Sequence, residues 1–166
     1  MKTTISASIL NTMILYAACV TFLSGCTNLK DFQGLWEGHV SEDVSVRAGF
    51  PVNTEMELNI HYAGPRKLEA EITTCLRDPE EGTCLPGDFQ DTPLEHLEKV
   101  QNDTLNTLTF GGEPYAVFLM TAQPMDLTEA EMMVFVSFHS KERVEVRLMR
   151  GSEIYGVFRL SRPRDG

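Results

Sequence analysis

The sequence predicts a mainly β protein, an antiparallel meander of about eight strands that forms a small barrel or a two-layer sandwich, with one or two short helices. Two observations lead to this prediction. Apolar and polar residues alternate with a period of two in several segments, which is typical of strands with one buried face. Short turns containing Gly and Pro separate these segments, so consecutive strands should lie side by side.

The alternation is clearest in two runs, residues 53–62 and 67–74, which we expect to form a hairpin around Ala63-Gly64-Pro65. The buried faces of the two runs would consist of Met56, Leu58, Ile60 and Tyr62 in the first and Leu68, Ala70, Ile72 and Thr74 in the second. The other strands of the meander are expected at residues 32–40, 104–110, 115–121, 132–139, 143–148 and 154–160.

Two segments predict helical structure. Thr92-Pro93-Leu94-Glu95 has the form of a capping box with Pro at the first helical position, so we expect a short helix that ends near Gln101. Residues 126–129 favour a single capped turn.

The first 26 residues read as a targeting signal. Residues 13–23 are apolar apart from Thr21, a run too short for a membrane span of about 20 residues but long enough for the core of a secretory signal. The next motif, Leu23-Ser24-Gly25-Cys26, resembles the lipobox of bacterial lipoproteins. Alternative interpretations are a plain secretory signal with a chance cysteine, or a single N-terminal membrane anchor.

The lipoprotein resemblance implies that residues 1–25 are removed and that Cys26 carries a diacylglyceryl lipid, which would be the protein's attachment to a membrane. Thr27 occupies the position at which an Asp would imply retention at the inner membrane, so the resemblance favours the outer membrane. We then expect residues 26–33 to be a tether and residues 34–166 to be a single β domain.

The composition is acidic, with a net charge of −10. Loss of residues 1–25 would remove Lys2 and no acidic residue, leaving −11. Because binding to phosphate backbones needs clustered Lys and Arg, this balance argues against nucleic acid as a partner, and against electrostatic docking to anionic lipid headgroups. We interpret the acidity as a contribution to solubility.

Two cysteines remain once Cys19 is assigned to the signal and Cys26 to the lipid. Cys75 and Cys84 form an even pair in an oxidising compartment, and the residues between them favour a turn, so we expect a disulfide. A metal site is the rival interpretation, but two thiols at this spacing match no zinc pattern.

Glycines flank the only tryptophan in Gly34-Leu35-Trp36-Glu37-Gly38. Gly34-x-Trp36 resembles the first-strand motif of lipocalin-like β-barrels, in which the Trp closes one end of the barrel against an Arg. That resemblance implies Arg159 or Arg162 as the cationic partner, although the chain lacks the Thr-Asp-Tyr turn of the family. The alternative is a Trp that fills the core of another small β domain.

No catalytic, metal or cofactor site emerges from the sequence. The histidines are scattered singly at His39, His61, His96 and His139. The acidic residues of the loop at 79–91 lack the spacing of an EF-hand, so we expect a solvated loop and not a calcium site. There is no Gly-x-Ser-x-Gly elbow, so we expect a protein that is not an enzyme and needs no cofactor.

Two functions remain. The first is a role in protein interaction or as an accessory in the envelope, with an envelope or host protein as partner and with residues 77–91 as the contact. The second is a lipocalin-like binder of a small apolar ligand, suggested by Gly34-x-Trp36 and by the Met and Phe content of the late strands. The residues of that second hypothesis are Phe118, Met120, Met132, Met133 and Phe135.

Overall fold

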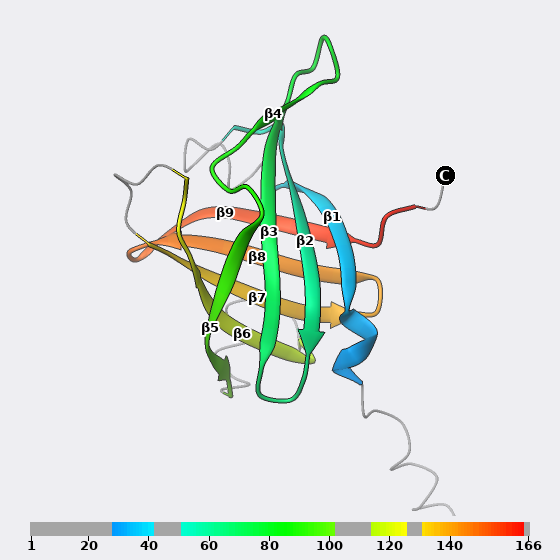
Figure 1. Cartoon of the computed structure of the whole chain (residues 1–166), viewed down its shortest axis with the longest axis vertical. Helices are drawn as coiled ribbons and strands as arrows, with labels where there is room; N and C mark the ends of the chain where they lie inside the picture. The colour runs from blue at the N-terminus through cyan, green and yellow to red at the C-terminus, as the bar shows by residue number, and fades with distance from the viewer. Residues whose placement is uncertain (1–27, 42–50, 102–113, 126–130, 165–166) are drawn as a thin grey trace, which may run out of the picture.

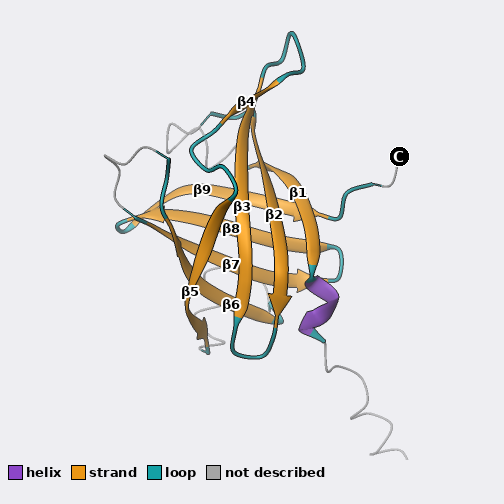
Figure 2. Cartoon of the chain, in the orientation of Figure 1, coloured by secondary structure: helices purple, strands orange, loops and turns teal. Residues whose placement is uncertain are grey.

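The computed structural model describes residues 28–41, 51–101, 114–125 and 131–164. These residues form one short 3₁₀ helix, η1, and nine strands (Figures 1 and 2). The elements are η1 (Leu29–Phe32), β1 (Gly34–Val40), β2 (Thr54–Ala63), β3 (Leu68–Arg77), β4 (Cys84–Pro86), β5 (Thr92–Val100), β6 (Ala116–Ala122), β7 (Met132–Ser140), β8 (Arg143–Arg150) and β9 (Glu153–Ser161).

The strands form a closed antiparallel barrel of eight, with β4 outside the ring. Each barrel strand pairs with its neighbours in the sequence, and β9 returns to pair with β1, where Gly38 lies opposite Leu160. β4 pairs only with the last residues of β3 and makes a hairpin that projects from the barrel (Figure 1). The predicted fold class is therefore confirmed, and the barrel is chosen over the sandwich.

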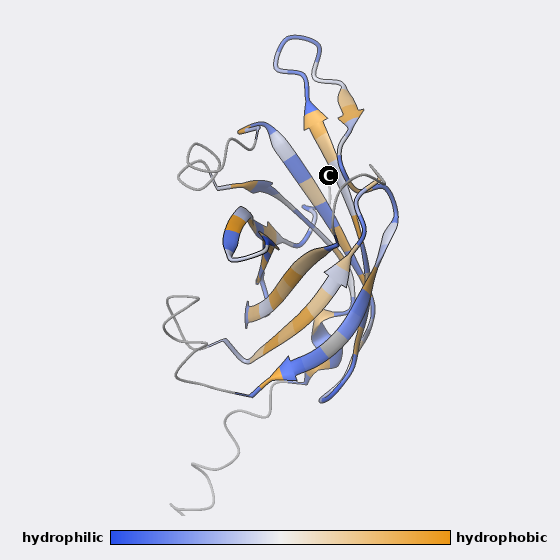
Figure 3. Cartoon of the chain, turned by 90° about the vertical axis from the view of Figure 1, so that its left-hand side faces the viewer, coloured by the Kyte–Doolittle hydropathy of each residue, from blue (hydrophilic) through white to orange (hydrophobic). Residues whose placement is uncertain are grey.

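Apolar side chains from all eight barrel strands meet in one cluster inside the barrel. The alternation of hydrophobic and hydrophilic residues along the strands is visible in Figure 3. Small barrels are commonly filled in this way, and burial of such side chains is the main stabilising contribution to folding. The largest fully buried members are Trp36, Phe32, Phe89, Phe118, Phe138, Phe158, Met56, Leu58, Ile60, Leu68, Ile72 and Met120.

The predicted helix at residues 92–101 is wrong, because this segment is strand β5. Leu94 lies opposite Ala70 of β3, and Lys99 lies opposite Phe118 of β6. A helix here would leave the facing edges of β3 and β6 without hydrogen-bond partners, so closure of the barrel overrides the local capping signal.

The predicted faces of β2 and β3 are confirmed except at Tyr62. The register between β2 and β3 shifts between Ile60 and Tyr62, and such a bulge moves the following side chain to the other face. Tyr62 is 40% exposed, and Ala63 takes the buried position instead. The expected strand at 104–110 and the capped turn at 126–129 lie outside the described residues.

The expected tether is partly wrong, because its last residues belong to the folded domain. Asn28 caps η1 through its side chain, which accepts a hydrogen bond from the backbone N–H of Lys30 at 3.2 Å. Phe32 is fully buried and stacks on Phe138, with ring centroids 4.4 Å apart. Because Phe32 packs in the core, the folded domain begins at η1 and not at Gly34.

The expected solvated loop at 79–91 also contains a core residue, Phe89, whose side chain is fully buried. Phe89 accepts a hydrogen bond from the backbone N–H of Thr74 at 2.8 Å and donates one to the Thr74 hydroxyl at 3.1 Å. The segment that follows β6 is fixed to the same end of the barrel, because the backbone N–H of Met125 donates a hydrogen bond to the carbonyl of Asp88 at 2.8 Å. Phe89 thus closes the barrel end opposite η1.

Substituting Phe89→Ala should lower the free energy of unfolding by about 3–5 kcal/mol, because it removes a buried ring and leaves a cavity. Urea unfolding followed by circular dichroism measures this loss. Leu85→Ala is the matched control from the same excursion, since Leu85 is 54% exposed and its loss should change stability by no more than about 0.5 kcal/mol. Equal losses in the two variants would contradict this role for Phe89.

Candidate functional site

Trp36 and Arg162 close the barrel at the η1 end. The Trp36 indole N–H donates to the carbonyl of Phe32 at 2.8 Å, and the Arg162 guanidinium lies 4.1 Å from the centre of the Trp36 ring. Arg162 also donates to the carbonyls of Asp31 and Gln33, each at 2.8 Å. This cation–π contact confirms Arg162 as the expected partner of Trp36.

Two residues beside this contact complete the geometry. Gly34 has φ +104, and a Cβ atom there would lie 2.9 Å from Nη1 of Arg162, so both the backbone and the guanidinium need glycine at this position. Arg159, the other candidate, points to the outer surface, with its Nε 3.9 Å from a carboxylate oxygen of Glu145. Partial burial lowers the pKa of Arg162, which stays protonated at neutral pH.

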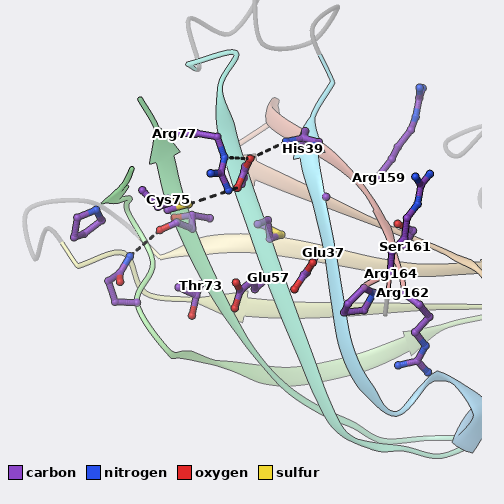
Figure 4. Close-up of a pocket in the computed structure, with 18 residues that line it drawn as sticks. Glu37, His39, Glu57, Thr73, Cys75, Arg77, Arg159, Ser161, Arg162 and Arg164 are labelled. Atoms are coloured by element: carbon purple, nitrogen blue, oxygen red, sulfur yellow. Dashed lines mark hydrogen bonds and ion pairs between the residues drawn. A yellow bond between two sulfur atoms is a disulfide. The ribbon is translucent and has the colours of Figure 1, made fainter. Parts of the chain in front are cut away.

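A groove with a volume of about 890 Å³ crosses the outer face of β1, β2, β3 and β9 (Figure 4). The β3–β4 hairpin and Gln90 form one wall, and the C-terminal residues 162–164 form the other. Its volume lies within the range of about 300–1,000 Å³ that is common for binding pockets. The groove is therefore the concave surface from which a functional site is built.

A row of polar residues crosses the floor of the groove. Glu37 of β1 lies opposite Glu57 of β2, with Ser161 next to Glu37 and Thr73 next to Glu57. Neither glutamate has a hydrogen-bond or ion-pair partner among the described residues. Like charges directly opposite on neighbouring strands repel each other, so a cationic group between them would be stabilising.

A second row of polar residues in the groove contains an ion pair, in which Glu55 and Arg77 neutralise each other. The Glu55 carboxylate accepts two hydrogen bonds from the Arg77 guanidinium at 2.5 and 2.6 Å, and the His39 Nδ1 lies 3.4 Å from it. The hydrogen bonds from Arg77 lower the pKa of Glu55 despite the opposing effect of burial. Arg77 also donates to the carbonyl of Gly82 at 2.9 Å, which holds the tip of the hairpin.

The structure brings Cys75 and Cys84 to disulfide distance, with Cα atoms 5.5 Å apart. Together with Glu55, these two residues are the one group of three possible metal ligands among the described residues. Sulfurs joined in a disulfide are poor metal ligands, and the charge of Glu55 is neutralised by Arg77. The residues present therefore fit a structural bridge at the base of the hairpin and do not fit a metal centre.

Two acidic residues of the loop between β3 and β5, Asp78 and Asp91, accept hydrogen bonds from different groups. The Asp78 carboxylate accepts the backbone N–H groups of Glu80 and Glu81 at 2.7 and 3.0 Å, which lowers its pKa. The Asp91 carboxylate accepts from the hydroxyl of Thr73 at 3.0 Å, on the other side of the hairpin. These carboxylates stabilise turns and do not converge on a common centre, so nothing in the described loop forms a calcium site.

The histidines are distributed over different surfaces. His39 faces Glu55 in the groove, and His61 lies 3.4 Å from Glu71 on the outer face of the same sheet. His96, expected on a helix, lies on β5 with its ring against the edge of Phe118 at 5.8 Å. The Nε2 atom of His96 is buried and has no hydrogen-bond partner among the described residues.

His139 is the histidine nearest to a nucleophile. Its Nε2 lies 3.0 Å from the hydroxyl of Ser137, and burial lowers its pKa. Ser137 is fully buried and also donates to the backbone carbonyl of Glu145 at 3.2 Å. A nucleophile must reach its substrate, so this Ser–His pair does not meet the geometry of a catalytic site.

Comparison with known proteins yields one partial similarity. The chain is 30% identical over 96 residues to an NAD-dependent protein deacylase of Rhodopirellula baltica, a match that covers 58% of this chain and 37% of that protein. This chain thus spans little more than a third of the length of that relative. No protein-family model and no solved structure matches the chain.

Sequence reasoning identified the cysteine pair and Arg162 but missed the groove. Glu55 and Arg77 lie on neighbouring strands, and their pairing depends on the register between β2 and β3, which the bulge near Tyr62 alters. Cys26 and the lipobox lie outside the described residues. No helix in the described part of the chain is long and apolar enough to cross a bilayer.

Glu55→Gln should destabilise the protein at pH 7, because it removes the carboxylate that Arg77 binds. The folded-state pKa of Glu55 lies below its ordinary value of 4.5, so this contribution is complete above that value and is lost as the pH falls through the folded-state pKa. Urea unfolding at pH 7 and pH 3 should show a difference from the native protein that shrinks at the lower pH.

Glu57→Gln on the same strand is the control, because Glu57 has no cationic partner among the described residues and faces Glu37. It should leave stability at pH 7 unchanged or slightly raised, since a like-charge pair is removed. A Glu55→Gln variant that is as stable as Glu57→Gln at pH 7 would contradict the role given to the Glu55–Arg77 pair.

Proposed function

We propose that this protein is a lipid-anchored lipoprotein of the bacterial cell envelope, whose barrel is not catalytic and acts by binding another protein at its outer surface. The observation that carries the binding role is the filled and closed barrel. Trp36 with Arg162 closes one end, Phe89 closes the other, and the interior is occupied by apolar side chains. The outer groove is left as the concave surface open to a partner.

The anchor rests on the sequence at Leu23-Ser24-Gly25-Cys26. A diacyl lipid on Cys26 would supply the two chains that stable attachment needs. The envelope outside the cytoplasm is also a compartment in which a disulfide such as Cys75–Cys84 persists. Both features support the same location, and Thr27 favours the outer membrane over the inner membrane.

The groove suggests the chemistry of the partner. The unpaired Glu37 and Glu57 on its floor favour a Lys or Arg side chain from the partner protein. The hairpin wall, stapled by Cys75–Cys84 and held by Arg77, offers a rigid edge for an adjoining segment. The expected contact region at residues 77–91 is one wall of this same groove.

The similarity to a deacylase does not supply a catalytic site here. NAD is commonly bound by a parallel sheet with a Gly-x-Gly-x-x-Gly turn, whereas the described strands are antiparallel and the sequence contains no such motif. Ser137 of the Ser137–His139 pair is fully buried in the described barrel wall and cannot reach a substrate. We therefore propose a protein that is not an enzyme.

The alternative is a lipocalin-like binder of a small apolar ligand, and the Trp36–Arg162 contact favours it. Three of the residues suggested for it, Phe118, Met120 and Met132, are fully buried within the filled interior, so a ligand would have to displace them or Phe89. Native mass spectrometry of the purified protein distinguishes the two functions, since a bound apolar molecule is expected only for this alternative.

Substituting Cys26→Ala should abolish incorporation of a clickable fatty acid and should remove the protein from the outer-membrane fraction. Cys19→Ala is the matched control, because Cys19 lies in the segment that is expected to be cut away and its loss should change neither readout. Acylation of the Cys26→Ala protein at the native level, or its unchanged fractionation, would contradict the proposed anchor.

A photo-crosslinking residue in place of Thr73, on the floor of the groove, should capture a specific envelope protein. The same probe at Glu153, an exposed residue at the start of β9 and away from the groove, is the control. Adding Glu37→Lys and Glu57→Lys to the Thr73 probe should reduce capture about tenfold, the effect of roughly 1.4 kcal/mol of lost charge complementarity. Capture that is the same at both positions, or unaffected by the two charge changes, would contradict binding in the groove.

A further inference from the structure

The two ends of the barrel carry opposite charge, although the chain as a whole is acidic. The η1 end is formed by η1, the β2–β3 turn and the β7–β8 turn (Figure 1), and Arg162 contacts η1 from the segment after β9. Its described basic residues are Lys30, Arg66, Lys67, Lys141, Arg143 and Arg162, and they outnumber its described acidic residues Asp31, Glu69 and Glu142. The described acidic residues of the opposite end are Asp78, Glu80, Glu81, Asp88, Asp91, Glu131 and Glu153.

Direct contacts show that the basic segments share one surface. Lys141 of the β7–β8 turn forms an ion pair with Asp31 of η1 at 2.8 Å. Arg162 of the C-terminal segment donates to the Asp31 carbonyl at 2.8 Å. The side chain of Gln33 reaches the carbonyl of His61 at 3.3 Å, which brings the β2–β3 turn to the same end.

Most of these positive charges are not neutralised within the protein. Lys67 is paired with Glu69, and Lys141 is paired with Asp31. Arg162 donates to uncharged carbonyl groups and keeps its positive charge. The remaining three residues have no ion pair among the described residues and are exposed: Lys30, Arg66 and Arg143.

Exposed tyrosines lie on the same end. Tyr62 is 40% exposed beside the β2–β3 turn, where the bulge in β2 turns it outward. Tyr115 is 53% exposed, and its ring lies 6.4 Å from that of Phe32 in η1. Tyrosine combines an apolar ring with a polar hydroxyl and is enriched at the interface between membrane and water.

We propose that the η1 end is a membrane-facing surface that binds anionic phospholipid headgroups through its unpaired Lys and Arg side chains. This inference rests on the proposed lipid anchor at Cys26. Only three Cα-to-Cα steps separate Cys26 from Leu29, the first residue of η1, which allows a span of about 11 Å. At that distance the cationic side chains lie within about one Debye length of the headgroups.

The charge separation then orients the domain. Attraction at the η1 end and repulsion of the acidic end both place the projecting β3–β4 hairpin away from the bilayer. Each Lys or Arg near an anionic surface favours the docked state about fivefold, so the three cations without an ion pair among the described residues bias the orientation strongly. The lipid supplies attachment, whereas this surface decides which side of the barrel faces the membrane.

Hydrogen exchange of the acylated full-length protein, reconstituted in vesicles, tests the proposal. In vesicles containing phosphatidylglycerol, peptides covering residues 62–67 and 140–143 should exchange at least about fivefold more slowly than in phosphatidylcholine alone. The protection should disappear at about 1 M salt, where screening shortens the range of the attraction to about 3 Å. Peptides from residues 78–83 at the acidic end should exchange equally in both vesicles.

The three-site variant Lys30→Gln, Arg66→Gln and Arg143→Gln should lose this protection while remaining acylated. The matched control, Glu80→Gln, Glu81→Gln and Glu153→Gln, should keep it. Equal exchange in the two vesicle types by an acylated native protein would overturn the membrane-facing surface and leave the anchor intact. Absence of the acyl group on the native protein would overturn the anchor itself.

Discussion

The contact between Arg162 and Trp36 links the first and last strands of the barrel, and it depends on closure of the barrel between β1 and β9. β9 must reach β1 before Arg162 can stack on the indole and donate to the carbonyls that end η1. These partners are separated by most of the sequence, so their association has a large loop-closure cost that the filled interior must offset. Gly34 is required at the same point, because any side chain there would meet the guanidinium.

Because apolar side chains fill the interior of the barrel, a functional site is expected on its outer surface. With Phe89 at one end and Trp36 at the other, the interior stabilises the fold, and the polar outer faces are free to vary. The groove over β1, β2, β3 and β9 adjoins the basic η1 end at Arg162, which contributes to both. A domain held at the membrane through one side would still present its groove and hairpin to a protein partner.

Strands with a clean alternation were predictable from the sequence, because the period of two is a local property of the chain. The β2–β3 hairpin and the late strands β8 and β9 are of this kind, whereas β6 and β7 were predicted from continuous apolar runs. β5 was not, because Thr92-Pro93-Leu94-Glu95 carries a strong local helix signal and becomes a strand only when β3 and β6 both need a partner. The burial of Phe89 was not predictable either, because Phe89 is a single aromatic residue within an acidic loop that contains Gly and Pro.

The sequence alone determined that the protein is a β meander, that Cys75 and Cys84 form a pair, and that Arg162 is a candidate partner for Trp36. Each of these follows from residues close in sequence or from a short motif. Only the tertiary structure decided between barrel and sandwich, aligned Glu37 with Glu57, and gathered Lys30, Arg66 and Lys141 on one end. These features depend on register and closure, which bring together side chains from distant segments, and a net charge of −10 conceals how the charges are arranged in space.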